Sequence, residues 1–380
     1  MASNLIEAET QVPEIPQPQL ADCLEALYGL VASHWQRLDG YDDRNYRLTG
    51  LANSGKESSR PAPDFSEGLV LKITNPMEAA VQGLIEGQTA YCRHVADAKL
   101  SFASPEILPT LNGRFYDTFQ FRIGEKVYNL PVRLMPYRKG RVLRAPQLNS
   151  LLLKDIGFLA AQFRFAASDF AHPIYEQHRT HWSLADAPAC RPFIKELPAA
   201  DQQRLANEVL DTVQAQLNQA LAELPSGQIH GDINEGNLLA EEKVGAWRLV
   251  AVLDLWDTHR APFVFDLALP MVYLMLLGGS VPLLDIGAHI LAGYQNLWKL
   301  SREELGVLHS AMCARLVQSL VWGWHSYQLN PVPENAYTLN TQKNGWQLLR
   351  KLWAIPSQDL LAHWTTVDTY DQWTPPILPK

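Results

Sequence analysis

The chain has 380 residues, 47% of them hydrophobic, which is enough for one large or two ordinary domains with buried cores. Its 32 Lys and Arg residues against 40 Asp and Glu residues give a formal net charge of -8, which opposes the phosphate field of nucleic acids and anionic membranes and disfavours both as partners. The four cysteines lie far apart without a Cys-x-x-Cys pair, so neither a zinc site nor a disulfide scaffold is expected.

The first residues lack the basic, apolar and small-residue order of a signal peptide, which predicts a cytoplasmic protein with free thiols. Residues 1–18 contain proline and glutamate with weak periodicity and are expected to form a flexible tail. Apolar residues then recur at helical spacing over 19–34, which predicts a first helix.

Residues 19–136 are predicted to form an N-terminal lobe that binds nucleotide. Short apolar runs broken by Gly and Pro predict strands at 45–48, 68–73, 119–123 and 128–134. One helix is predicted at about 76–96, and the Gly, Ser and Pro content of 49–67 predicts an exposed hairpin loop. The lobe should therefore be a small antiparallel sheet with one long helix.

Residues 137–380 are predicted to form a larger, mainly helical lobe. Helical periodicity occurs near 147–169, 199–224, 265–277, 284–298, 302–329 and 337–352. The uncharged run Leu267–Leu284 approaches membrane-spanning length, but Pro270 and the pair Gly278–Gly279 interrupt it, which favours a buried helix with a glycine stop. The expected fold class is α+β.

The stretch 229–239 is the most informative part of the sequence. His230-Gly231-Asp232 is followed after four residues by Asn237, and a second apolar run ends in Asp254. Phosphoryl transfer needs one carboxylate that orients and deprotonates an acceptor hydroxyl, and hard oxygen ligands that hold Mg²⁺ on the nucleotide phosphates. The two carboxylates and the amide of this stretch meet those needs.

This arrangement resembles the catalytic loop of the protein-kinase-like superfamily, in the His-Gly-Asp form of aminoglycoside phosphotransferases and choline kinases. The resemblance implies a two-lobe fold and ATP or GTP as phosphate donor. It also implies that Asp232 is the catalytic acid and that Asn237 and Asp254 are metal ligands. Leu255-Trp256 follows Asp254 where the family usually has Phe-Gly. We expect this departure to affect the mobility of the loop more than metal binding.

Two further residues are expected to support the loop. His230 is expected to brace the loop by hydrogen bonds, because Asp232 already takes the acid-base role. Asp266 begins a predicted helix after the metal-binding segment, and we expect it to be a buried brace of the same loop.

A cation against the nucleotide phosphates is expected from the first lobe. Lys72 lies within the apolar run Leu69–Ile73, where it is an edge residue or, given the downstream motif, the phosphate-contacting lysine. The following helix contains Glu78 and Glu86. Glu86 is predicted to form the ion pair with Lys72, because it lies deeper in that helix.

The hairpin Tyr-Asp-Asp-Arg-Asn-Tyr at 41–46 is most similar to the hydroxylysine kinase branch of the superfamily. Weaker matches follow in order at 182–184, 263–268, 293–294 and 333–337. The resemblance implies an acceptor with a hydroxyl and a cationic amine, best represented by 5-hydroxylysine. Asp257 is either a solvated loop carboxylate or a ligand of that amine.

Other functions remain open from the sequence. Within the same fold the acceptor is alternatively an aminoglycoside, choline or ethanolamine, homoserine or a sugar. A catalytically silent kinase-like binding module is an alternative of another class, although such a module has no chemical need for Lys72, Asp232, Asn237 and Asp254 together. A protein kinase is disfavoured by the short segment between Asp254 and Phe263. The oligomeric state is open.

Overall fold

The computed structural model describes residues 12–40, 42–55, 66–329, 331, 339–369 and 373–377. The chain divides into two compact units. The first unit contains the residues up to Asp97 together with Ser104–Lys139 and His172–Ile174. The second unit contains Ala98–Ala103, Gly140–Ala171 and the residues from Tyr175 onward.

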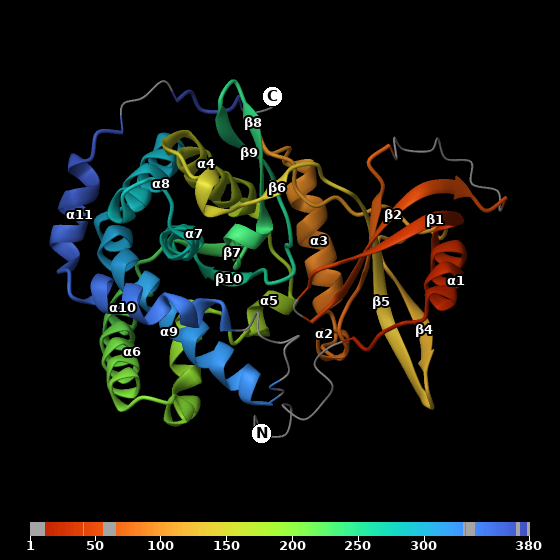
Figure 1. The fold of residues 1–380 in the computed structure, drawn as a ribbon, viewed down its shortest axis with the longest axis horizontal. Coiled ribbons are helices and arrows are strands. Elements are labelled where there is room, and N and C mark those ends of the chain that lie inside the picture. Colours follow the sequence, from red (N-terminus) through yellow and green to blue (C-terminus); the bar gives the residue numbers. More distant parts are fainter. Residues whose placement is uncertain are drawn as a thin grey trace. The chain divides into compact units, whose positions relative to one another are not determined.

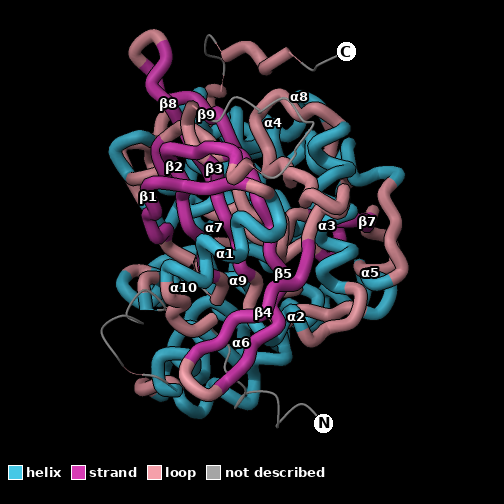
Figure 2. Tube along the Cα trace, turned by 90° about the vertical axis from the view of Figure 1, so that its right-hand side faces the viewer, coloured by secondary structure: helices cyan, strands magenta, loops and turns pink. Residues whose placement is uncertain are grey.

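A five-stranded antiparallel sheet forms the centre of the first unit (Figure 1, Figure 2). Its spatial order is β1-β2-β3-β5-β4. Side chains alternate between the two faces of the sheet, so Leu71 lies in the main core while Lys72 lies on the opposite face. The strands are β1 (Leu30–Leu38), β2 (Arg44–Asn53), β3 (Leu69–Ile73), β4 (Asp117–Ile123) and β5 (Lys126–Pro136).

Helix α1 (Gln17–Tyr28) packs on the core face of this sheet, and it differs from the helix predicted at 19–34. Gly29 ends the helix in a left-handed conformation, with φ of 68°, and the chain continues directly as β1. Val12 and Ile15, predicted to lie in a flexible tail, are buried in the core beside α1. Residues 1–11 of that predicted tail lie outside the described residues.

The single helix predicted at 76–96 is two helices, α2 (Pro76–Ala79) and α3 (Leu84–Asp97). Asn75 caps α2 by accepting a hydrogen bond from the Glu78 N–H at 2.9 Å. Gly83, with φ of 81°, separates the two helices. Helices α1 and α3 lie on opposite sides of the sheet (Figure 1). The predicted loop at 49–67 begins as the end of β2, and its residues 56–65 lie outside the described part.

The second unit is mainly helical. Helices α4 (Ser150–Ala166) and α8 (Leu283–Leu297) cross at backbone contact, because a Cβ on Gly157 would lie 1.9 Å from the Ile290 carbonyl oxygen. The remaining helices are α5 (Ile174–Gln177, which begins in the first unit), α6 (Ala200–Ala220), α7 (Val264–Leu277), α9 (Arg302–Leu329), α10 (Gly345–Trp353) and α11 (Ser357–Thr366).

Two small sheets carry the predicted motifs. Strand β7 (Ser226–Ile229) pairs with β10 (His259–Pro262), and β8 (Leu238–Lys243) lies between β6 (Arg141–Val142) and β9 (Ala246–Val252). The 230–237 segment therefore joins β7 to β8, and 253–258 joins β9 to β10. The antiparallel first part and the helical remainder confirm the predicted α+β class.

Two apolar helices account for the hydrophobic runs. Helix α7 ends at Leu277 and is capped by Gly278, so the run at 267–284 contains a buried helix with a glycine stop. Helix α9 has the length and apolar composition of a membrane-spanning helix, but 83% of its most apolar 18-residue window is buried inside the structure. This burial is typical of a core helix.

Candidate active site

Gly231 shapes the 230–237 segment, which we call the catalytic loop. Its φ of 83° lies in the left-handed region, and a Cβ at this position would lie 2.5 Å from the Asp257 carbonyl oxygen. The close approach joins the catalytic loop to the segment that follows β9. Glycine is therefore required here both for the backbone conformation and for the space.

Gly231→Ala is expected to destabilise the fold by about 1–2 kcal/mol from the left-handed backbone alone, with the steric clash adding to it. Turnover should fall as well, because the substitution pushes Asp232 out of place. Urea unfolding and steady-state kinetics measure the two effects. Gly306→Ala is the matched control, since a Cβ there meets nothing within 4 Å. Equal stability of Gly231→Ala and wild type would contradict this account.

Asp266, in the first turn of α7, holds the start of the catalytic loop. Its Oδ2 accepts the His230 N–H at 2.7 Å, and its Oδ1 accepts the Gly231 N–H at 2.9 Å. Burial raises the pKa of Asp266, while the nearby His230 and the two N–H donors oppose that rise. The side chain is only 3% exposed, so its hydrogen-bonding capacity is directed to the loop backbone.

His230 connects the catalytic loop to the residue before Asp254. Its Nδ1 accepts the Asp232 N–H at 3.2 Å, so the ring proton lies on Nε2, which donates to the Leu253 carbonyl oxygen at 3.0 Å. The ring is buried and packs edge-on against Phe163. These contacts occupy both ring nitrogens, so the histidine braces the loop.

The two oxygens of the Asp232 carboxylate have different hydrogen-bond partners. Its Oδ2 accepts the Nδ2–H groups of Asn234 at 2.7 Å and Asn237 at 2.9 Å. Its Oδ1 has one longer contact, 3.3 Å from Nη2 of Arg315. The side chain is 23% exposed. Oδ1 therefore retains lone-pair capacity for a group that approaches from solvent.

Arg315 of α9 and Asn234 were missed by sequence reasoning. Arg315 is buried, and besides Asp232 it donates to the Trp182 carbonyl oxygen at 2.8 Å and to the Tyr273 hydroxyl at 3.1 Å. No local pattern could indicate it, because Arg315 lies 83 residues from Asp232. The sequence pattern Asp-x-Asn at 232–234 was the available signal for Asn234.

Asn237 and Asp254 lie at neighbouring strand ends. The Leu253 N–H donates to the Asn237 carbonyl oxygen at 2.8 Å, which fixes the two segments together. The Nδ2–H group of Asn237 donates to Asp232, which leaves Oδ1 of Asn237 available as an oxygen ligand for a metal. The carboxylate of Asp254 adds a second oxygen ligand. Asp254 has an unusual φ of 58°, and Leu255 and Trp256 after it are buried. Oxygen donors of this kind fit Mg²⁺.

Asp257 is half-buried, and its negative charge helps to keep Arg315 protonated. Its carbonyl oxygen accepts a hydrogen bond from Nδ1 of His259 at 2.8 Å.

In the first unit, Lys72 is buried and forms an ion pair with Asp43. The prediction that Glu86 is its partner is wrong. The break between α2 and α3 places Glu86 in the first turn of α3, where its side chain is exposed. Asp43 belongs to the Tyr-Asp-Asp hairpin, of which Tyr41 lies outside the described residues, as does the weak match at 333–337.

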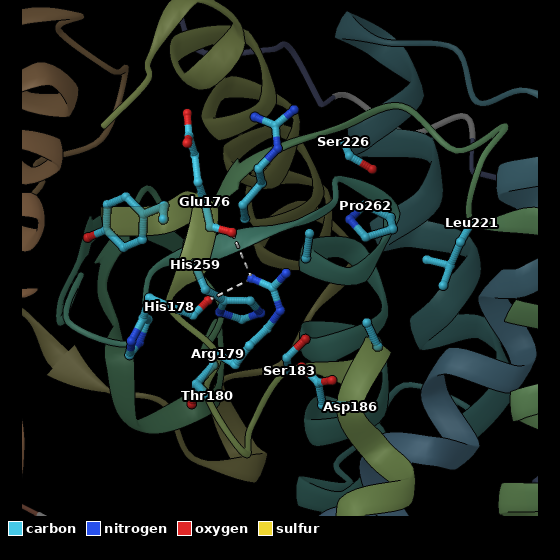
Figure 3. A pocket seen from close by; sticks show the side chains of 14 residues that line it. Glu176, His178, Arg179, Thr180, Ser183, Asp186, Leu221, Ser226, His259 and Pro262 are labelled. Atoms are coloured by element: carbon cyan, nitrogen blue, oxygen red, sulfur yellow. Dashed lines mark hydrogen bonds between the residues drawn. The ribbon is translucent and has the colours of Figure 1, made fainter. Parts of the chain in front are cut away.

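A cavity of about 470 Å³ lies beside β7 and β10 in the second unit (Figure 3). Ser226, His178 and the buried His259 line it, together with Arg179, which donates to the His178 carbonyl oxygen at 3.0 Å. Burial lowers the pKa of His259 to about 4, so the ring is neutral at pH 7. The carboxylates of the catalytic loop do not line this cavity.

A model of the phosphotransferase enzyme family matches residues 34–297, which span more than half of the chain and include the first-unit lysine and the whole catalytic loop. The chain belongs to this family. Proteins that are similar over nearly the full length include those named hydroxylysine kinase from Bos taurus and Danio rerio. The bovine protein is 27% identical over 94% of this chain and 95% of its own, and the zebrafish protein 26% identical over 93% and 95%.

Solved structures show the same kinase-like fold. An amicoumacin kinase in complex with AMP-PNP and Ca²⁺ superposes with a TM-score of 0.64 at 15% identity, covering 90% of this chain and 97% of that one. A microcompartment-associated aminopropanol kinase gives 0.64 at 15% identity over 91% and 98%. The predicted two-lobe kinase-like fold and the assignment as a small-molecule phosphotransferase acting on a hydroxyl are confirmed.

Proposed function

We propose that this phosphotransferase transfers the terminal phosphoryl group of ATP or GTP to the hydroxyl of an amine-bearing metabolite, with 5-hydroxylysine as the first acceptor to test. The observation that carries the proposal is the Asp232 carboxylate, in which Oδ2 is held by two amides while Oδ1 keeps capacity to accept a proton. The relatives named hydroxylysine kinase, which match over nearly the whole chain, support the choice of acceptor.

In the proposed reaction, Asp232 acts on the acceptor hydroxyl. Oδ1 accepts the hydroxyl proton as the hydroxyl oxygen forms its bond to the terminal phosphorus, and the bond from that phosphorus to the bridging oxygen breaks to release the nucleoside diphosphate. Asn234 and Asn237 fix the plane of the carboxylate through Oδ2. Positioning of this kind supplies much of the catalysis in phosphoryl transfer.

The phosphate side of the reaction is assigned to Lys72 and to a metal held by Asn237 and Asp254. Mg²⁺ bound there would neutralise negative charge on the transferred phosphates. Lys72 supplies a positive charge from β3 of the first unit. The backbone hydrogen bond from Leu253 to Asn237 keeps the two proposed metal ligands together.

We assign the binding of the acceptor's amine to the acidic residues around Asp232, including Asp257. When the ammonium group of an acceptor pairs with a buried or half-buried carboxylate, masking the amine leaves that carboxylate without its partner. Masking the amine should therefore cost more binding free energy than removing an uncharged part of the acceptor. 5-Hydroxylysine should therefore be phosphorylated with Mg²⁺ and a purine triphosphate, and its N-acetylated form should be a much poorer acceptor.

Nucleotide consumption with ATP or GTP, measured across hydroxy amino acids, amino alcohols and neutral sugars, tests this assignment. Choline, ethanolamine, homoserine and an aminoglycoside complete the panel, so each alternative acceptor has its own outcome. Equal rates on 5-hydroxylysine and its N-acetylated form, or activity confined to neutral sugars, would overturn the amine recognition. Nucleotide binding with no turnover of any acceptor in the panel would favour a catalytically silent binding module.

A further inference from the structure

Asp43 occupies a buried position beside the phosphate-binding lysine. It lies in the turn between β1 and β2, immediately before the strand pairing in which Arg44 faces Ile73 and Asn45 faces Lys72. This register brings the turn to the end of β3 that carries the lysine. Asp43 is 9% exposed although it is charged, so its carboxylate needs partners within the protein.

Three donors hold the Asp43 carboxylate. Its Oδ2 pairs with Nζ of Lys72, and its Oδ1 accepts both the N–H and the Nδ2–H of Asn75, at 2.8 and 2.9 Å. The carboxylate is therefore fixed independently of the lysine. A fixed anion restricts the ammonium of Lys72 to one place, which a mobile surface acid would not do.

The neighbouring carboxyls are in different electrostatic states. Burial alone would raise the pKa of Asp43, but the charge of Lys72 and the hydrogen bonds from Lys72 and Asn75 hold it below its usual value. Burial and the charge of Asp43 raise the pKa of Asp42 to about 7 and also raise that of Glu78. Asp43 is thus the carboxyl of this group whose pKa is lowered rather than raised.

Hydrogen bonds extend from Asp43 to the helices around the lysine. Asn75, which donates to Asp43, caps α2 through the Glu78 N–H. Glu78 accepts the Nε2–H of Gln88 at 2.8 Å, and Oε1 of Gln88 accepts Nη2–H of the buried Arg133 at 2.9 Å. The hairpin turn, α2, α3 and β5 are therefore joined in one buried polar network.

We propose that Asp43 is the positioning residue of Lys72 and takes the part that the sequence assigned to Glu86 of α3. The proposal rests on the proposed function, because it concerns the lysine assigned to the nucleotide phosphates. It implies that the hairpin turn itself, rather than a helix, determines where the lysine stands when a nucleotide binds. Movement of that turn would then change nucleotide affinity directly.

Calorimetric titration with Mg²⁺ and ATP tests this role without depending on the acceptor. Asp43→Asn should weaken nucleotide binding by about tenfold, the size of coupling seen for contacting charged residues. Glu86→Gln and the matched control Asp39→Asn, an exposed acid near the same turn, should bind nucleotide as wild type does. If Asp43 merely repelled the phosphates as a like charge, Asp43→Asn would bind more tightly, which would overturn the proposal.

A double-mutant cycle separates positioning from general structural support. Lys72→Met combined with Asp43→Asn removes both charges of the pair, so neither is left buried without the other, and the double variant should fold even if Asp43→Asn alone does not. The double variant should bind nucleotide as weakly as Lys72→Met alone, because Asp43 acts through the lysine. Additive losses would contradict the positioning role. A wild-type protein that fails to bind any nucleotide would overturn the proposed function itself, and this inference with it.

Discussion

Asp232→Asn is expected to lower turnover by about 10²–10⁴-fold, the usual contribution of a general base, while nucleotide affinity stays close to wild type and the protein stays folded, with some loss of thermal stability because Arg315 loses its contact with Oδ1. The amide is isosteric with the carboxylate. Its oxygen can keep the hydrogen bonds from Asn234 and Asn237, which turns its NH₂ group toward the position of Oδ1. That group donates rather than accepts, so the acceptor hydroxyl loses the oxygen that takes its proton.

Steady-state kinetics, thermal unfolding and nucleotide titration on the same preparation measure these three expectations. Asp211→Asn serves as the matched control, because that carboxylate is 72% exposed and pairs at the surface with Arg191. Retention of more than a tenth of the wild-type turnover by Asp232→Asn would rule out the assigned role of Asp232.

Arg315→Met is expected to lower the free energy of unfolding by an amount on the order of 3 kcal/mol and to reduce turnover as well. The substitution keeps apolar volume but removes the cation beside Asp232 and leaves the Trp182 carbonyl oxygen and the Tyr273 hydroxyl without a donor from it. Arg315→Lys should fall between wild type and Arg315→Met, since lysine keeps the charge but lacks the planar fork of donors.

Urea unfolding and turnover distinguish Arg315 from a surface arginine. Arg191→Met is the control, because Arg191 pairs with an exposed aspartate and such pairs contribute about 0–1 kcal/mol. A variant Arg315→Met that unfolds like wild type and turns over at the same rate would show that the pair with Asp232 has no part in organising the catalytic loop.

The catalytic loop could be predicted from the sequence because its residues are close together in the chain. Spacing alone relates Asp232 to Asn237, and apolar runs on both sides predict the strands that end at the loop. Asp254 and Asp266 also follow in order, each at an element boundary.

The partners of Lys72 and Asp232 could not be predicted, because both depend on contacts between distant parts of the chain. Asp43 meets Lys72 through the pairing register of β2 and β3, and a shift by one residue would turn the lysine to the other face. The prediction of Glu86 depends on one continuous helix over 76–96, but that helix breaks between Ala79 and Leu84, where Gly83 has a φ of 81°. Arg315 reaches the catalytic loop from the middle of a buried helix.

The most direct test of the central claim is to identify the product that wild type forms from 5-hydroxylysine, Mg²⁺ and ATP or GTP by phosphorus NMR and mass spectrometry. The account predicts a phosphate monoester of the acceptor hydroxyl, formed in equal amount with the nucleoside diphosphate, and its loss in Asp232→Asn. Release of inorganic phosphate without a phosphorylated acceptor, or the same product at the same rate from Asp232→Asn, would contradict it.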